Sequence, residues 1–414
     1  MSSPLLASID RVHEGAPHRV KDDEKAMLYR EICAGRPAAR GSLARDLGLR
    51  PTSVSQAVRE LLADGLVAES QEGPRGRSGR PERLLVPRPD RMAAISIYVD
   101  SRELKGALVN LDESILAEEF RTVPADAGNS ALSAAIFGLA RSLRRSVPRT
   151  ARLVGASVSL VGTVNPRTAT WVSAARWPKL SDLDLSKAEA RLGFPVALRR
   201  TNETELEYWL ACNPDAAGKS VVLLHWGFGI GSAVSYRGEL LASSIGRFGE
   251  IGHIRLGGRA GGRPGGRRRG GGAAACVCGS TGCLETQAAL WALLPRLRAR
   301  LGRLPEDEGE LAPLLSDPRL LAVPVVREAL LAVQDALLVL HRIFYPDIVL
   351  LSGPLPENPR IFARLAEGFH RSLPGYARGS VDFAAIPGGM NGCRRGGASP
   401  LFRDTLRETL RRRS

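Results

Sequence analysis

The sequence predicts an α/β protein in which a winged helix-turn-helix domain precedes two related α/β lobes. Two patterns lead to this prediction. Three short helical patterns and two strand patterns fill residues 22–87, and strands alternate with helices from residue 93 onward. The length of 414 residues agrees, because a domain usually has ~100–200 residues and the chain therefore has room for two or three.

Three helices are expected before residue 66. Asp22 or Asp23 is the predicted cap of the first helix, and Ser42 that of the second. The third begins at Pro51, because proline is tolerated in a first helical turn, where its missing N–H has no partner to lose. The apolar residues of this third helix fall on one face at helical spacing, and they are Val54, Val58, Leu61 and Leu62.

The third helix and a following hairpin form the predicted DNA-binding surface. In a winged helix-turn-helix, small polar side chains near the start of this helix meet base edges in the major groove. Arginines among glycines at a hairpin tip suit the narrow, negative minor groove. The alternative is a three-helix interaction module whose polar face is only solvated. The residues predicted to contact double-stranded operator DNA are Thr52, Ser53, Ser55, Gln56 and Arg59 in the helix and Arg75, Arg77 and Arg80 in the hairpin.

The remainder of the chain reads as two lobes of similar order. Strands around a turn at 112–114, a helix through Leu139 and the strand LVGASVSLVG form the first. The segment VVLLHWGFGIGSAVSYRGELL opens the second, which continues through a long apolar helix to DIVLLSG. The predicted divisions are a flexible tail 1–21, the DNA-binding domain 22–87, a linker 88–92, an N-terminal lobe 93–205 and a C-terminal lobe 206–414.

The positive charge of the chain is unevenly placed. Lys and Arg number 58 against 43 Asp and Glu, a net charge of +15. The Gly/Arg-rich segment 257–275 has five arginines and no acid, and so contributes a third of this excess. Its composition predicts disorder. The excess is therefore local, which argues against a general coat for nucleic acid.

Three cysteines in CVCGSTGC predict a metal site. Thiols this dense in a reducing compartment are more often zinc ligands than disulfides, although unligated thiols remain the alternative. His253 is the nearest candidate for the fourth ligand, and a closed Cys3His site would be structural. The predicted ligands of this structural zinc are His253, Cys276, Cys278 and Cys283.

Carboxylates and amides near these cysteines predict a small-molecule site. Sugar hydroxyls both donate and accept hydrogen bonds, so carboxylate and amide groups suit them together. Individually, such residues more often lie at the surface or cap helices. The Gly-rich segment GFGIG (227–231) is a weak signal that fits either a ligand or a tight turn. The predicted effector-binding residues are Asn202, Glu203, Glu250, His253 and Glu285.

These motifs together resemble the ROK family, which groups bacterial repressors and sugar kinases. The resemblance lies in FGEIGH (248–253), CVCGSTGCLE (276–285), GFGIG, TNETE (201–205) and LSGP (351–354). The segment GRPERLLV (79–86) resembles the repressor branch. The resemblance implies a two-lobed, actin-like (ribonuclease H-like) ATPase fold behind the DNA-binding domain. It also implies zinc at the ligands above, a sugar effector, and a homo-oligomer, either a dimer or a tetramer.

The sequence departs from the kinases of that family in two places that matter for catalysis. Their Asp-x-Gly-x-Thr phosphate turn is replaced by YVDSRELKG, and the aspartate of their Asn-Asp pair is replaced by Glu203. A further methylene moves a carboxylate by about 1.5 Å, a misplacement that is costly to catalysis. The departures predict that the chain is not an enzyme and has no catalytic residues.

The expected function is therefore a DNA-binding transcriptional regulator, a repressor of carbohydrate-related genes that a sugar-derived effector releases from its operator. The alternatives are an ATP-dependent sugar kinase with an added DNA-binding domain and a scaffold with an inactive pocket. The sequence has no apolar run of ~18 residues and no secretory signal at Met1, so no membrane contact and a cytoplasmic location are expected.

Overall fold

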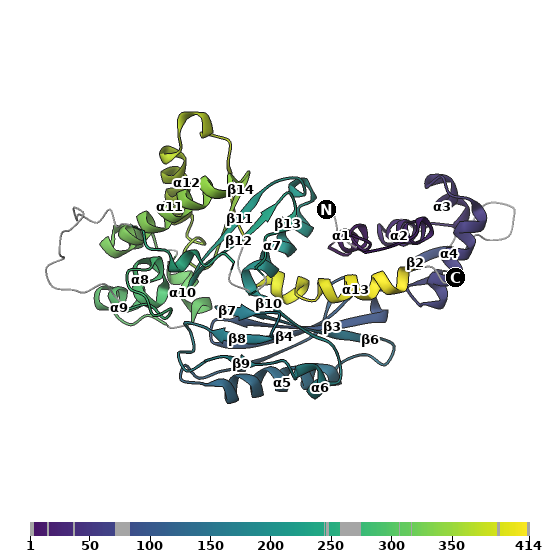
Figure 1. Ribbon diagram of the computed structural model, residues 1–414, viewed down its shortest axis with the longest axis horizontal. Helices are drawn as coiled ribbons and strands as arrows, with labels where there is room; N and C mark the ends of the chain where they lie inside the picture. The colour runs from purple at the N-terminus through teal and green to yellow at the C-terminus, as the bar shows by residue number, and fades with distance from the viewer. Residues whose placement is uncertain are drawn as a thin grey trace.

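Within the residues that the computed structural model describes, two five-stranded sheets share one strand order and form the two lobes (Figure 1). In each sheet, three strands run antiparallel in a meander, and two further strands join in parallel on the other side. This common topology confirms that the lobes are related. The described ranges are 4–14, 16–35, 38–70, 83–243, 245, 248–256, 275–305, 307–315, 317–386 and 390–411.

The N-terminal lobe is built on a sheet whose central strands are buried on both faces. Its strands are β3 (Met92–Asp100), β4 (Glu103–Asn110), β5 (Ile115–Thr122), β6 (Arg152–Leu160) and β10 (Val196–Arg200), in the order β10-β6-β3-β4-β5. Alternate residues of β3 point to opposite faces. Ile95 and Ile97 pack with α5 (Asn129–Arg145), and Ala94 packs with the DNA-binding domain. Smaller elements complete this lobe, namely β7 (Thr163–Asn165), β8 (Thr170–Ser173), β9 (Leu183–Asp184) and α6 (Ala188–Leu192).

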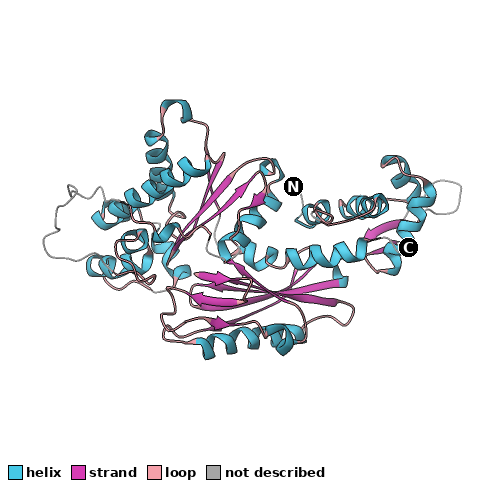
Figure 2. Cartoon of the chain, viewed as in Figure 1, coloured by secondary structure: helices cyan, strands magenta, loops and turns pink. Residues whose placement is uncertain are grey.

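The C-terminal lobe has the helices between residues 284 and 372 on one side of its sheet (Figure 2). The strands are β11 (Val221–Trp226), β12 (Ile230–Tyr236), β13 (Glu239–Leu240), β14 (Ile348–Ser352) and β15 (Asp382–Ala385). The helices are α8 (Leu284–Ala288), α9 (Leu290–Leu301), α10 (Glu308–Leu315), α11 (Pro324–Phe344) and α12 (Pro359–Ser372). The helix α7 (Thr201–Cys212) connects the lobes, since it follows β10 and packs against β12.

The DNA-binding domain has the predicted helices and hairpin. They are α2 (Val20–Cys33), α3 (Arg40–Asp46), α4 (Pro51–Ala63) and the antiparallel pair β1 (Val67–Ser70) and β2 (Leu84–Pro87). Pro51 begins α4 as predicted. The predicted caps were wrong: α2 begins two residues before Asp22, which instead accepts a hydrogen bond from the backbone N–H of Arg19, and α3 begins before Ser42.

The prediction of a flexible tail at 1–21 was wrong for part of that segment. Residues Pro4–Asp10 form α1, and Leu5 and Ile9 are buried against the C-terminal helix α13 (Ser399–Leu410) and α2. Leu5, Ile9 and Val12 do recur at helical spacing, but nothing near them in the chain shows what will bury them, because α13 lies almost 400 residues away. The linker 88–92 forms a short 3-10 turn (Pro89–Arg91), after which β3 begins at Met92.

The division at 206–414 was also wrong at its far end, because α13 returns to the N-terminal half. In Figure 1 this helix, in yellow, lies along the N-terminal sheet and beside α1 and α2. Phe402, Leu406 and Leu410 are buried in one core with Val154 of β6 and Leu28 of α2. Fully burying a side chain of this size stabilises a fold by about 1.5–3 kcal/mol. The C-terminal helix therefore joins the DNA-binding domain to the N-terminal lobe.

A buried lysine lies where these parts meet. The ammonium of Lys25 on α2 is fully buried and donates to the carboxylate of Asp64 (3.0 Å), just after α4, and to the carbonyl oxygen of Thr409 on α13 (2.9 Å). It also lies 3.3 Å from the carboxylate of Glu60. One cation thus links the predicted recognition helix to the C-terminal helix.

Replacing Lys25 with Met should lower the free energy of unfolding by about 3–5 kcal/mol, because breaking a buried ion pair leaves buried charge without its counter-ion. Denaturant titration measures this change. The matched control is Lys21→Met on the exposed face of the same helix, which should change the value by under about 0.5 kcal/mol. Equal effects from the two variants would contradict the structural role of Lys25.

Candidate functional site

A cavity between the two lobes brings together four of the five predicted effector-binding residues. Asn202, Glu250, His253 and Glu285 all line it. Glu203 is not among the lining residues; its carboxylate accepts a hydrogen bond from Arg200 (3.2 Å), which does line the cavity. Burial raises the pKa of Glu203, although the Arg200 guanidinium opposes this rise. The carboxylate of Glu203 is thus bonded to Arg200 and is not part of the cavity lining.

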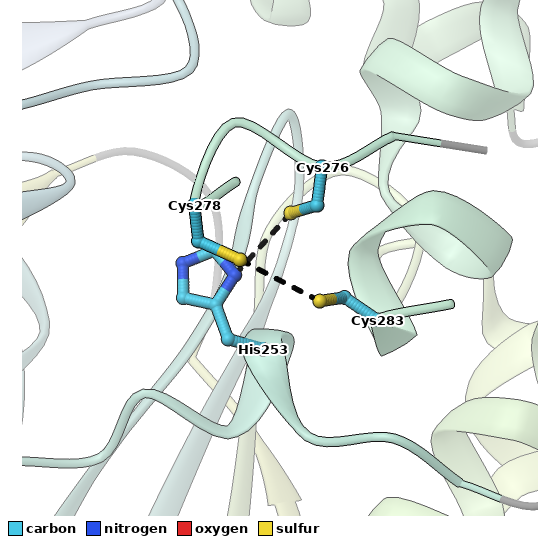
Figure 3. Close-up of side chains that lie close together, drawn as sticks. All are labelled: His253, Cys276, Cys278 and Cys283. Atoms are coloured by element: carbon cyan, nitrogen blue, oxygen red, sulfur yellow. Dashed lines mark hydrogen bonds between the residues drawn. The ribbon is translucent and has the colours of Figure 1, made fainter. Parts of the chain in front are cut away.

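The four predicted metal ligands also meet, and one of them, His253, lines this cavity (Figure 3). Their ligand atoms lie within 4.8 Å of one another, and the Sγ atom of Cys276 lies 3.4 Å from Nδ1 of His253. The Sγ atoms of Cys278 and Cys283 are 3.6 Å apart. Zinc–sulfur bonds of ~2.3 Å at tetrahedral angles place ligand atoms about 3.5–3.8 Å apart. The cluster therefore has the dimensions and the donor set for a tetrahedral metal ion.

Glycines allow the histidine segment to approach β12. Gly249 has a positive φ of 76°, and a Cβ atom there would lie 2.1 Å from the carbonyl oxygen of Ser232. A Cβ atom on Gly252 would lie 2.2 Å from the carbonyl oxygen of Ile230 and 2.8 Å from Cγ of Glu285. Both contacts are shorter than real Cβ atoms make. The glycines of FGEIGH thus let the short helix Ile251–His253 present His253 to the cysteines.

Glu250 connects the metal cluster to the rest of the cavity. One of its oxygens accepts from Arg200 (3.0 Å), and the other lies 3.7 Å from Nε2 of His253. Because Nδ1 of His253 faces Cys276, the second ring nitrogen is directed toward a carboxylate, as in many metal sites.

Glu285 is nine-tenths buried and accepts from the backbone N–H of Ile230 (2.9 Å) and from the indole of Trp291 (3.3 Å).

Sequence reasoning missed an ion pair that crosses the cavity from one lobe to the other. Arg176, which follows β8, donates to Glu308 at the start of α10 (2.6 Å), and its guanidinium lies 4.2 Å from the ring centre of Phe228. Glu308 also accepts from the backbone N–H of Phe228 (2.6 Å). Phe228 lies in GFGIG, but no local pattern marks Glu308, whose role depends on the meeting of the lobes.

The segment that replaces the phosphate turn of the kinases connects β3 to β4, and its polar side chains are hydrogen-bonded within the protein. Asp100 accepts an ion-paired hydrogen bond from Lys105 (2.7 Å). Ser101, with a positive φ of 56°, accepts a hydrogen bond from the backbone N–H of Glu308 (3.0 Å). The side chain of Ser101 thus joins the two lobes.

The predicted recognition helix presents part of its polar face. Thr52, Gln56 and Arg59 are exposed, and Ser53 and Ser55 are half-buried, while Val54 and Val58 are in the core. The hairpin arginines Arg75, Arg77 and Arg80 and nearly all of the Gly/Arg segment 257–275 lie outside the described residues. No helix of the described ranges is long and apolar enough to cross a bilayer.

The sequence profile described as "ROK family" matches residues 94–403. The chain belongs to the ROK family. Among curated ROK relatives, the DNA-binding transcriptional repressor Mlc of Escherichia coli K12 is 24% identical over 375 residues, covering 87% of this chain and 88% of Mlc. The N-acetylglucosamine repressor of Escherichia coli O157:H7 is 24% identical over 357 residues, covering 83% of each chain.

Solved ROK structures share the fold. A ROK-family transcriptional regulator described as a homologue of Escherichia coli Mlc superposes with a TM-score of 0.71 at 20% identity, covering 94% of this chain and 98% of its own. The uncovered 6% is shorter than the segment from α2 to β2, so the match extends into the DNA-binding domain. The ROK hexokinase of Thermus thermophilus gives 0.56 at 23% identity, covering 75% and 97%.

Gly252→Ala should lower the free energy of unfolding by about 1–3 kcal/mol, since the added methyl group overlaps a backbone oxygen and Glu285 and forces local shifts. Denaturant titration of the two variants tests this. Gly138→Ala, in the middle of α5 with no atom within 4 Å of the new methyl group, should instead raise the free energy by about 0.4–1 kcal/mol. A neutral Gly252→Ala would contradict the close approach described above.

Proposed function

We propose that this ROK protein is a DNA-binding transcriptional repressor of carbohydrate-related genes. The observation that carries the proposal is the continuous core that attaches a winged helix-turn-helix to the ROK lobes through α13. Curated relatives that align over more than four-fifths of this chain are named as repressors, and one is named for N-acetylglucosamine.

DNA recognition is assigned to the exposed start of α4. Thr52 and Gln56 have side chains that hydrogen-bond base edges, and the charge of Arg59 suits either guanine or a phosphate. Ser53 and Ser55 flank them, and Arg75, Arg77 and Arg80 would extend the contact into the minor groove. As a homo-oligomer, two such domains would read paired half-sites on operator DNA.

The effector site is assigned to the interlobe cavity. Asn202, Glu250 and Glu285 supply the mixed donors and acceptors that sugar hydroxyls need. His253 lines the same cavity, with its Nε2 atom 3.7 Å from the carboxylate of Glu250. Ligand binding would release DNA only if the ligand prefers the conformation that cannot bind the operator. A physical connection exists, since Glu205 on α7 accepts hydrogen bonds from the backbone N–H groups of Gly392 and Cys393, just before α13.

The metal is proposed to be zinc with a structural role. A set of three thiolates and one imidazole matches the ligand preference of zinc, and four ligands from the protein would leave no open position for catalysis. The ion would hold the cysteine loop and the helix Ile251–His253 together, and so fix Glu250 and Glu285 at the cavity.

Sugar phosphorylation is the less supported function, although a hexokinase shares the fold. Asp100 is paired with Lys105, and Ser101 is bonded to the C-terminal lobe, so neither cradles a phosphate. Glu203 is paired with Arg200 and lies outside the cavity lining, so it is not placed as a general base. These contacts favour a regulator over a kinase.

Selection from random DNA duplexes with the full chain should enrich a two-fold symmetric sequence. Arg59→Ala should then weaken binding to it by about 10–100-fold, because a base or phosphate contact is worth about 1–3 kcal/mol. Mobility-shift titration measures the loss. Arg364→Ala on the exposed face of α12 is the control and should bind normally. Failure to enrich any sequence would contradict the proposed function.

Elemental analysis of the purified chain should find one zinc ion per chain. Cys283→Ser should lose the metal and lower the melting temperature, because the ion binds only the folded site. Cys212→Ser, whose thiol lies on α7 away from the cluster, should retain it. A fully folded wild-type protein without metal would refute the assignment.

A further inference from the structure

Arg176 is a buried cation that offers an unused donor at the interlobe cavity. The residue is only 7% exposed and lines the cavity. Its Nη2 group donates to Glu308, but Nη1 is buried and has no hydrogen-bond partner among the described residues. A buried N–H without an acceptor is costly, and the penalty is larger on a charged group. Such a donor in a ligand cavity indicates that the ligand supplies the acceptor.

The guanidinium is held in one orientation before any ligand binds. Glu308 engages one edge, and the ring of Phe228 packs against the plane with 4.2 Å between the guanidinium carbon and the ring centre. Burial lowers the pKa of Arg176 although the charge of Glu308 opposes this shift, and the nearby charge of Arg102 acts in the same direction as burial. The surroundings thus compensate the positive charge incompletely. A fixed fork of donors is well matched to a planar or tetrahedral oxyanion.

A second buried polar group without a partner lines the same cavity. Thr201, at the start of α7, is 4% exposed and lines the cavity. Its hydroxyl also has no hydrogen-bond partner among the described residues. The carboxylates of Glu250, Glu285 and Glu308 each already accept from donors of the protein. Among the buried side-chain atoms of the described cavity lining, those without a hydrogen-bond partner thus belong to a cation and a hydroxyl, and both groups can donate.

We propose that the cavity's ligand is an anionic sugar derivative whose carboxylate or phosphate binds Nη1 of Arg176, with Thr201 as a further donor. This inference rests on the proposed effector site and specifies its ligand class. A neutral sugar would satisfy the same N–H with a hydroxyl, but a charge-assisted bond is roughly twice as strong. Arg176 is thereby the residue that sets specificity.

Calorimetric titration of the full chain with four probes tests this. The probes are glucose, glucose 6-phosphate, glucuronate and inorganic phosphate, the last to separate the anion from the sugar. At least one anionic sugar should bind roughly tenfold or more tighter than glucose, equivalent to about 1.4 kcal/mol. Equal affinity for glucose and both anionic sugars, or no binding of any sugar probe at millimolar concentration, would overturn the proposal.

Variants then assign the preference to the cation. Arg176→Met alone leaves Glu308 without its counter-ion, so the double variant Arg176→Met/Glu308→Gln guards against misfolding, and its melting curve reports on the fold. The double variant should lose the preference for anions. Glu308→Gln alone should strengthen it, since a competing carboxylate is removed, and Thr201→Val should weaken anion binding several-fold. Arg167→Met, an exposed arginine of the same lobe, should retain the preference.

A preference for anions that survives in the folded double variant would also refute the role of Arg176. Operator selection with the wild-type chain separates this outcome from failure of the proposed function. If only the anion proposal fails, the wild-type chain still selects a specific DNA sequence. A chain that prefers anionic sugars but selects no DNA sequence would instead refute the repressor proposal.

Discussion

The burial of one face of α13 is the constraint on which the arrangement of this molecule depends. Phe402, Leu406 and Leu410 recur at helical spacing and enter a core shared with the N-terminal sheet and with α1, α2 and α4. Lys25 adds a polar contact from the DNA-binding domain to the end of the same helix. Because the core belongs to three distant parts of the chain, the DNA-binding domain is packed on the N-terminal lobe and is not a freely tethered module.

The second constraint is the close approach of the segment around His253 to β12. The steric demand at Gly249 and Gly252 places this segment where His253 meets the three cysteines and Glu250 meets Arg200. The predicted metal cluster and the cavity therefore share His253. A metal ion bound at the cluster would also affect the cavity, because the carboxylates of Glu250 and Glu285 lie on the same segments that the ion would hold.

Contacts between the lobes converge on Glu308. The turn after β3 and the GFGIG segment both line the cavity, and both form a hydrogen bond with Glu308. Arg176 completes the connection. Charged and polar groups that bond one another across a cleft favour a closed arrangement, and a ligand that competes for them has a direct means of changing the relation between the lobes.

The sequence by itself determined the recognition helix and the cluster of predicted metal ligands. Local periodicity marks α4, and the spacing of Cys276, Cys278 and Cys283 marks a ligand loop, because both signals depend on near neighbours in the chain. Four of the five predicted effector-binding residues do line one cavity, but Glu203 does not. Only the tertiary structure decided that residues 4–10 form a helix, that α13 belongs with the N-terminal half, and that Arg176 meets Glu308. These features join residues 132 to almost 400 positions apart, and no local pattern encodes which buried surface or counter-charge a folded chain will bring to them.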